Sequence, residues 1–100
     1  MTGAELIALE RQRQIEEEGY TLKNDIRYNF NEELAQAASC YALPEVNRFY
    51  LRNDNKQEGP VHWPWLRPSW KPCPNDRKRE LVKAGALIAA EIDRLQSLGA

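Results

Sequence analysis

Apolar residues recur at helical spacing near the start of the chain. Positions 4, 7, 8, 11 and 15 share one helical face, and Thr2 with Glu5 has the spacing of a capping box. Gly19 suits the left-handed position that often ends a helix. We therefore predict a helix from Gly3 to Glu18, with Arg11 lying on the stripe that should be buried.

A second stretch with the same period covers residues 32–43. Asn29 or Asn31 can cap it, and Pro44 ends it. Its predicted buried stripe consists of Leu34, Ala37, Ala38 and Tyr41.

The last helix has the most regular pattern of the chain. It begins after a cap at Asn75 or Asp76, continues to Gly99, and has a seam of Leu81, Gly85, Ile88, Ile92 and Leu95. Glycine in mid-helix costs about 1 kcal/mol relative to alanine, so Gly85 indicates that a backbone or a ring packs closely there. Together these helices predict an all-α fold: a small three-helix bundle that forms one domain over residues 1–100.

Three connecting segments lack a sustained period. Residues 19–30 are rich in apolar side chains, which indicates an ordered connection packed on the helices, with a turn at Asn24–Asp25. Residues 44–51 suit either a short helical turn, which we favour, or a short extended piece. Residues 52–59 predict a solvated, mobile loop.

The segment from Val61 to Pro74, called the strap below, cannot be helical. It contains all three tryptophans (Trp63, Trp65 and Trp70) and four of the six prolines. Proline lacks a backbone donor and pushes the preceding residue toward extended conformations. Because a buried tryptophan removes about 150–250 Å² from water, we expect the rings to hold the strap against the helices. At least one of Trp65 and Trp70 should pack on the small-residue face around Ala84, Gly85 and Ala89.

Composition narrows the range of functions. A net charge of −1 argues against a dedicated nucleic-acid binder. No membrane span or signal peptide is evident, so we expect a cytoplasmic protein without a membrane partner. Cys40, Cys73 and His62 lack metal-ligand spacing, and we predict buried free thiols, no metal site and no cofactor.

Signals for catalysis are weak. His62 has no evident catalytic partner, and no glycines form a phosphate-binding loop, so no catalytic residue is assigned. The residue pattern of the last helix resembles that of the MazG-type nucleotide pyrophosphatases, an all-helical family. The metal ligands of that family come as ExxE on one helix and ExxD on a later one. The matching positions here are Glu33-x-x-Gln36 and Glu91-x-x-Arg94, so each pair has lost one carboxylate. A degraded pyrophosphatase is therefore an alternative hypothesis, and an enzyme is the less favoured class.

Aromatic rings and cations favour the binding of a small anionic ligand. Rings can stack on a base, and basic side chains can pair with a phosphate. The candidate ligand-binding residues are Arg11, Tyr20, Asp25, Tyr41, Trp63, Trp65, Arg67, Trp70, Lys71 and Lys83. The same tryptophans could instead form the core of a small domain, or a hot spot for a protein partner.

Several segments carry a family resemblance: ERQRQIEEEGY (10–20), Asp25, ELAQAASCYAL (33–43), WPW (63–65), WKP (70–72) and RKRELVKAGALIAAEIDRL (77–95). Together they resemble a small-protein family that is widespread in bacteriophages and prophages. Tyr20 stands where tryptophan is usual in that family, and residues 44–60 diverge. The resemblance implies a phage accessory protein and brings no established activity. A partial similarity to the ryanodine-receptor repeat domain, in the helix ending EGY and a later helix beginning DR, also implies ligand binding.

The leading hypothesis is a non-enzymatic phage accessory protein that binds a nucleotide-like anion and sequesters a host defence signal. The second hypothesis is a protein-interaction module that acts on a host factor. Tryptophans that line a concavity would favour a ligand, and tryptophans on a convex surface would favour a protein. The long seam of the last helix also admits a homodimer.

Overall fold

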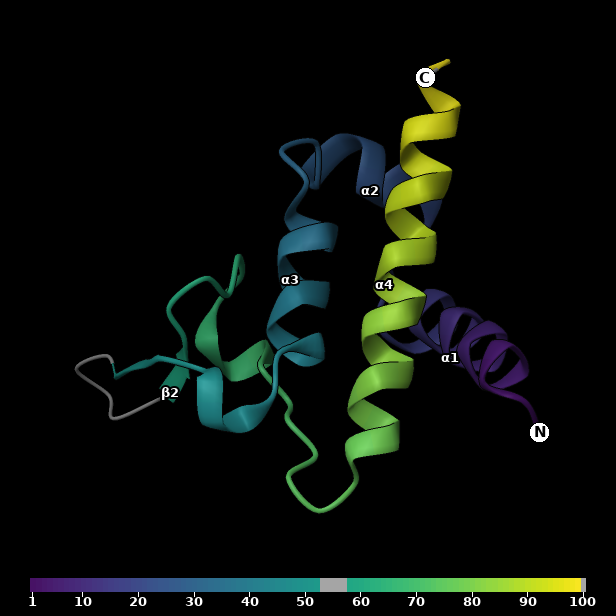
Figure 1. Ribbon diagram of the computed structural model, residues 1–100. Coiled ribbons are helices and arrows are strands. Elements are labelled where there is room, and N and C mark those ends of the chain that lie inside the picture. Colours follow the sequence, from purple (N-terminus) through teal and green to yellow (C-terminus); the bar gives the residue numbers. More distant parts are fainter. Residues whose placement is uncertain (53–57, 100) are drawn as a thin grey trace.

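The computed structural model describes residues 1–52 and 58–99, and most of this part is helical (Figure 1). Its helices are α1 (Gly3–Glu17), α2 (Leu22–Tyr28), α3 (Glu33–Ala42) and α4 (Arg77–Ser97). Short 3-10 turns lie at η1 (Glu45–Asn47) and η2 (Arg67–Ser69). Strands β1 (Tyr50–Arg52) and β2 (Glu58–Pro60) pair antiparallel, with Leu51 opposite Gly59. The all-α prediction is therefore right for the helices but misses this small sheet.

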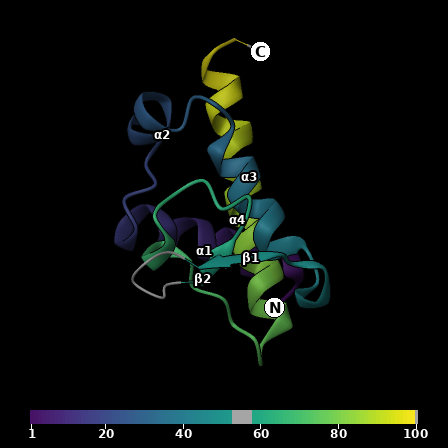
Figure 2. The same ribbon diagram turned by 90° about the vertical axis from the view of Figure 1, so that its left-hand side faces the viewer.

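Helix α4 is the longest element, and the other helices are arranged around it. Helix α3 lies alongside α4, whereas α1 runs across it (Figures 1 and 2). Helix α2 packs near the C-terminal end of α4, and the sheet lies beside α3, away from α4 (Figure 1). No helix of the described residues is long and apolar enough to cross a membrane.

The predicted helix ends are confirmed where a side-chain cap sets them. The Thr2 N–H donates to Glu5 Oε1 at 2.9 Å, and the Glu5 N–H donates to Thr2 Oγ1 at 3.2 Å, which completes the capping box. Gly19, with φ of 76°, follows the end of α1. Asp76 caps α4 by accepting a bond from the Arg79 N–H at 3.1 Å.

The connection before α3 differs from the prediction. Residues 19–30 contain a helix, α2, which begins after Thr21 because the Thr21 hydroxyl accepts from the Asn24 N–H. The predicted turn at Asn24–Asp25 is therefore wrong. Asn29 ends α2 instead of capping α3, which begins after Glu32 without a side-chain cap.

The other two connections are also more structured than predicted. Residues 44–51 contain both alternatives, because η1 is followed directly by β1. The predicted loop at 52–59 overlaps both strands, and its residues 53–57 lie outside the described part of the chain.

The buried faces of α1 and α4 are rotated from their predicted positions. Ala4 and Ala8 are exposed, whereas Glu10 and Gln14 are buried. On α4, the apolar seam residues Leu81, Ile88, Ile92 and Leu95 are exposed, and the buried residues are Glu80, Ala84, Ala86, Leu87, Ala90, Glu91 and Arg94.

The crossing of α1 and α4 explains why Gly85 differs from the rest of its seam. A Cβ added at Gly85 would lie 2.5 Å from the Ile7 Cδ1 atom. The closest neighbour of Gly85 is thus the Ile7 side chain of α1, where a backbone or a ring was predicted. The tryptophan in the core cluster with the adjacent Ala84 is Trp70.

The apolar core lies between α3, α4 and the strap. Tyr41 and Trp70 stack here with ring centroids 4.6 Å apart, and Trp70 is only 8% exposed. Cys40 is a buried free thiol as predicted, whereas Cys73 is a half-buried one. The core consists of Leu34, Ala37, Ala38, Cys40, Tyr41, Trp70, Ala84, Leu87 and Ala90.

Candidate functional site

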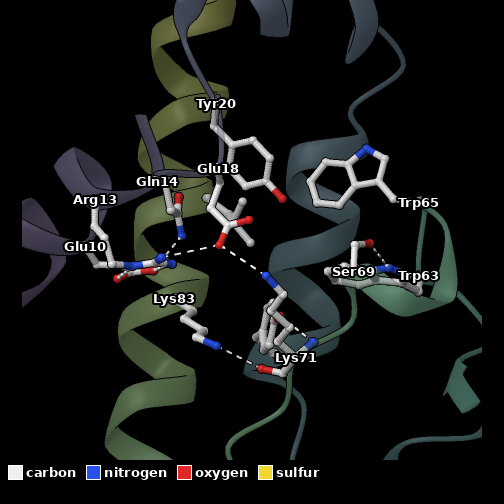
Figure 3. A pocket seen from close by; sticks show the side chains of 12 residues that line it. Glu10, Arg13, Gln14, Glu18, Tyr20, Trp63, Trp65, Ser69, Lys71 and Lys83 are labelled. Atoms are coloured by element: carbon white, nitrogen blue, oxygen red, sulfur yellow. Dashed lines mark hydrogen bonds and ion pairs between the residues drawn. The ribbon is translucent and has the colours of Figure 1, made fainter. Parts of the chain in front are cut away.

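A pocket opens between the C-terminal half of α1, the strap and α4 (Figure 3). The cavity has a volume of about 30 Å³, which is room for about one water molecule and far below the size of a typical ligand site. A larger ligand therefore fits only when the boundary between α1 and the strap opens. The pocket is lined by Glu10, Arg13, Gln14, Glu18, Tyr20, Tyr41, Trp63, Trp65, Ser69, Lys71, Lys83 and Leu87.

Many of the residues singled out from the sequence meet in this pocket. Those that line it are Tyr20, Tyr41, Trp63, Trp65, Lys71 and Lys83. They come from the end of α1, from α3, from the strap and from α4, which are far apart in the sequence. The fold therefore gathers the aromatic and cationic candidates into one place.

Two candidates near α2 lie outside the pocket. Arg11 donates to the Tyr20 backbone carbonyl at 2.7 Å and lies 3.8 Å from an Asp93 carboxylate oxygen, so it joins the end of α1 to α4. Asp25 is fully buried, and its Oδ1 accepts from Asn29 Nδ2 at 2.9 Å. Burial is the main reason that the pKa of Asp25 is raised.

The remaining two candidates hold the strap in place. Arg67 donates to the Leu51 carbonyl at 3.3 Å and so connects η2 to β1. Trp70 belongs to the core, where the Arg48 guanidinium lies 5.3 Å from its ring centroid.

Aromatic rings form one wall of the pocket. The rings of Tyr20 and Trp65 lie 5.4 Å apart. Trp63 meets both Trp65 and Tyr41 edge to face, at 5.3 Å and 5.6 Å. Behind this wall, Glu18, Tyr20, Trp65 and Ser69 also line an outer groove with Asn24, Tyr28 and Asn29. A flat ligand could therefore stack on the face of one ring and meet the edge of a neighbouring one.

Hydrogen bonds fix the orientation of both tryptophans in this wall. Trp63 Nε1 donates to Ser69 Oγ at 3.0 Å. Trp65 Nε1 donates to Asn29 Oδ1 at 3.0 Å, and Asn29 in turn donates to buried Asp25. The wall is thus tied both to the strap itself and to α2.

The inner end of the pocket is polar, and sequence analysis did not identify it. Glu10 has no exposed side-chain surface, and it accepts two bonds of 2.8 Å from Arg13 and lies 2.6 Å from Arg79. Burial alone would raise the pKa of Glu10, but the bond from Arg13 and the charges of both arginines lower it. Gln14, which is 3% exposed, donates to Glu10 Oε2 at 3.2 Å. The i, i+3, i+7 spacing of Ile7, Glu10 and Gln14 is the signal that could have identified this face.

Cations surround the mouth of the pocket. The Lys71 ammonium lies 3.5 Å from Glu18 Oε1, and its side chain is 60% exposed. Lys83 Nζ donates to the Lys71 carbonyl at 2.8 Å and lies 5.3 Å from the Tyr41 ring centroid (Figure 3). Lys83 therefore supports the strap. Lys71 is the most exposed basic side chain of the pocket lining, because Arg13 is 32% exposed and is paired with Glu10, Glu17 and Glu18.

The tyrosines of the pocket are held neutral. Burial, followed by the nearby Glu18 carboxylate, raises the pKa of Tyr20 to about 12. Burial also raises the pKa of Tyr41, whose hydroxyl accepts from the Lys71 N–H at 3.2 Å. Both rings are therefore uncharged near neutral pH and can offer their faces to a ligand.

The carboxylates compared with those of the pyrophosphatases are arranged differently. Glu91 is buried and accepts two bonds from Arg94, at 2.7 Å and 2.8 Å. Within residues 1–52 and 58–99, no group of three or more His, Cys, Asp or Glu side chains could hold a metal ion. The Glu91 carboxylate is thus committed to a guanidinium.

The pocket combines stacking surfaces, a polar inner end and an exposed cation. These features suit the binding of a flat, polar molecule with an anionic group. Compared with known proteins, the chain matches no protein-family model, no curated protein and no solved structure.

Proposed function

We propose that the protein binds a small anionic ligand with a flat ring, of nucleotide type, in the pocket between α1 and the strap. One observation carries this proposal: Trp63 and Trp65 are only half-buried and line a concavity that has Lys71 at its mouth. A concave arrangement favours a small ligand over a protein partner as the occupant of the strap.

The aromatic wall supplies the recognition of the ring. Stacking of one base on an aromatic side chain contributes about 1–3 kcal/mol. Trp65 is suited to this role because its indole nitrogen is already bonded to Asn29, which fixes the plane of the ring before a ligand arrives. A preorganised surface of this kind lowers the entropy cost of binding.

Lys71 supplies the recognition of the anion. Its distance of 3.5 Å from Glu18 is longer than the 2.7–2.9 Å typical of a strong charged hydrogen bond. Such an exposed pair contributes little stability, so a ligand phosphate can replace Glu18 as the partner of the ammonium. The phage resemblance suggests the setting for this activity, in which binding sequesters a nucleotide-like host signal.

Calorimetry with nucleoside mono-, di- and cyclic phosphates tests the proposal. We expect at least one of them to bind with micromolar affinity and to change the tryptophan fluorescence, because the ring would stack on Trp65. Lys71→Ala should weaken this binding about tenfold, as the loss of a charged contact requires. Lys23→Ala is the matched control, because Lys23 is an exposed lysine on α2 that does not line the pocket.

Two results would overturn the proposal. One is the lack of any binding stronger than millimolar across the whole panel. The other is binding that Lys71→Ala and Lys23→Ala weaken equally, because the ligand would then recognise the overall charge of the protein and not this pocket.

A further inference from the structure

Gln14 is a buried amide with only one of its two ends bonded. Its Nε2 donates to Glu10 Oε2 at 3.2 Å. Its Oε1 has no hydrogen-bond partner among the described residues, although it is buried. Figure 3 shows the oxygen end pointing away from Glu10 and toward the side of the pocket where Tyr20 lies.

The orientation of this amide is set by chemistry. The Glu10 carboxylate is held ionised by Arg13 and Arg79, so it can only accept hydrogen bonds. Gln14 must therefore turn its nitrogen toward Glu10 and its carbonyl oxygen away from it, and Gln14 is one of the residues that line the pocket. The tightly held Glu10 makes a rotation of the amide unfavourable.

A second buried amide has both of its ends bonded, although the Asp25 Oδ2 atom beside it has no hydrogen-bond partner among the described residues. Asn29 also donates to a buried carboxylate, that of Asp25, and its oxygen accepts the Trp65 indole N–H. Asn29 and Gln14 thus have the same design, but the oxygen of Gln14 lacks a protein donor among the described residues. A buried carbonyl without a hydrogen-bond donor raises the free energy of the folded protein. A ligand that supplies a donor at this position is therefore favoured over one that does not.

We propose that Gln14 selects ligands whose ring carries an N–H donor, such as the amino group of adenine, and that this edge of the ring points to the inner end of the pocket. This inference rests on the proposed function and names the class of ligand more closely. A phosphate cannot occupy the same position, because its oxygens would face the Gln14 oxygen and the Glu10 carboxylate. The phosphate therefore lies at the mouth, where Lys71 is exposed.

The test compares two ligands that differ in one donor. Adenosine monophosphate carries the amino group, and the corresponding purine nucleotide without the amino group lacks it. We expect the unaltered protein to bind the amino compound about tenfold more tightly, which is the effect of one buried hydrogen bond. This measurement needs no variant and so does not depend on the folding of one.

Gln14→Met should abolish the discrimination. The methionine keeps the length of the side chain and removes the acceptor, so the two nucleotides should then bind equally. Gln12→Met is the matched control, because Gln12 is an exposed glutamine on the same helix, and it should leave the preference intact. The melting temperature of Gln14→Met should stay within about 4 °C of the unaltered protein, since Arg13 and Arg79 still hold Glu10.

The outcomes separate this inference from the proposed function. Equal binding of both nucleotides by the unaltered protein, or a preference that survives Gln14→Met, would overturn the role of Gln14 and leave the pocket as an anion-binding site. Failure of both nucleotides and of the wider panel to bind would overturn the proposed function and this inference with it.

Discussion

Glu80 of α4 joins two arginines and the strap at the C-terminal end of α3. Its carboxylate accepts from Arg48 at 3.0 Å and 3.3 Å and from the Cys73 N–H at 3.0 Å. Arg77 also lies 3.1 Å from it. The side chains of Glu80 and Arg48 are 4% and 1% exposed. We predict that Glu80→Gln, which preserves size and removes the charge, destabilises the protein strongly.

The expected loss follows from the burial of Arg48. Removing one partner of a buried pair leaves the other charge uncompensated, at a cost of about 3–5 kcal/mol. Because glutamine can still accept a bond, we expect about 3 kcal/mol, the lower limit. At about 4–8 °C per kcal/mol for a domain of this size, the melting temperature should fall by about 12–24 °C. That is a large part of a total stability of about 5–15 kcal/mol.

Circular dichroism melts of four variants measure this effect: Glu80→Gln, Arg48→Met, the two combined, and Glu45→Gln. Glu45→Gln is the control, because Glu45 is an exposed acid in η1, and its change should be below about 0.5 kcal/mol. Arg48→Met combined with Glu80→Gln should cost less than the sum of the two single changes, since no unpaired charge remains. Additive costs, or a change of less than about 0.5 kcal/mol for Glu80→Gln alone, would refute the reasoning.

The pair also predicts a dependence on pH. Burial alone would raise the pKa of Glu80, but the bonds from Arg48, Cys73 and Arg77 lower it below its ordinary value of 4.5. A group with a lowered pKa stabilises the fold above its unfolded pKa and loses that effect as the pH falls through its folded pKa. The difference in stability between the unaltered protein and Glu80→Gln should therefore be full near neutral pH and shrink in acid. A difference that stays constant into acid would contradict the assignment.

Two further predictions concern packing. Trp70→Ala should lower the free energy of unfolding by about 3–5 kcal/mol in a chemical denaturation experiment, because Trp70 is 8% exposed and stacks on Tyr41. A decrease of less than about 1 kcal/mol would show that the strap is not part of the core. Gly85→Leu should lower the free energy of unfolding by about 1–3 kcal/mol, because the leucine would overpack against Ile7. Adding Ile7→Ala to the same chain should restore part of that free energy. No recovery would mean that α1 does not cross α4 at this point.

Local chemistry made part of the fold predictable. Thr2 and Asp76 cap their helices through side chains that are within three residues of the donors they accept from, so the sequence contains the whole interaction. The burial of α1 and α4 depends instead on distant partners. Glu10 is buried because Arg79 of another helix reaches it, and no periodic pattern places a charged residue in the interior.

The candidate site was likewise predictable only in part. Aromatic residues and lysines were identifiable because rings concentrated in a proline-rich segment must pack somewhere, and the pocket brings Trp63, Trp65 and Lys71 together. Trp70 and Arg67 have the same composition signal but serve the core and the sheet, since only the path of the strap decides which side chains face α1. The spacing of Gln14 with Ile7 and Glu10 could have identified the helix face, but its unpaired buried oxygen exists only in the folded chain.

The position of the pocket follows from where the strap is bonded. The strap is tied to α3 by Gln36, whose Nε2 donates to the His62 carbonyl at 2.6 Å, to α2 through Trp65, and to α4 through Lys83. Among the described residues, the polar contact between the strap and the end of α1 is the ion pair of Lys71 with Glu18, at 3.5 Å. The boundary between α1 and the strap is therefore the seam that can open without breaking a buried hydrogen bond. A ligand that enters there exchanges one exposed ion pair for stacking and a phosphate contact, and this exchange is why an anion, rather than a neutral ring, suits the pocket.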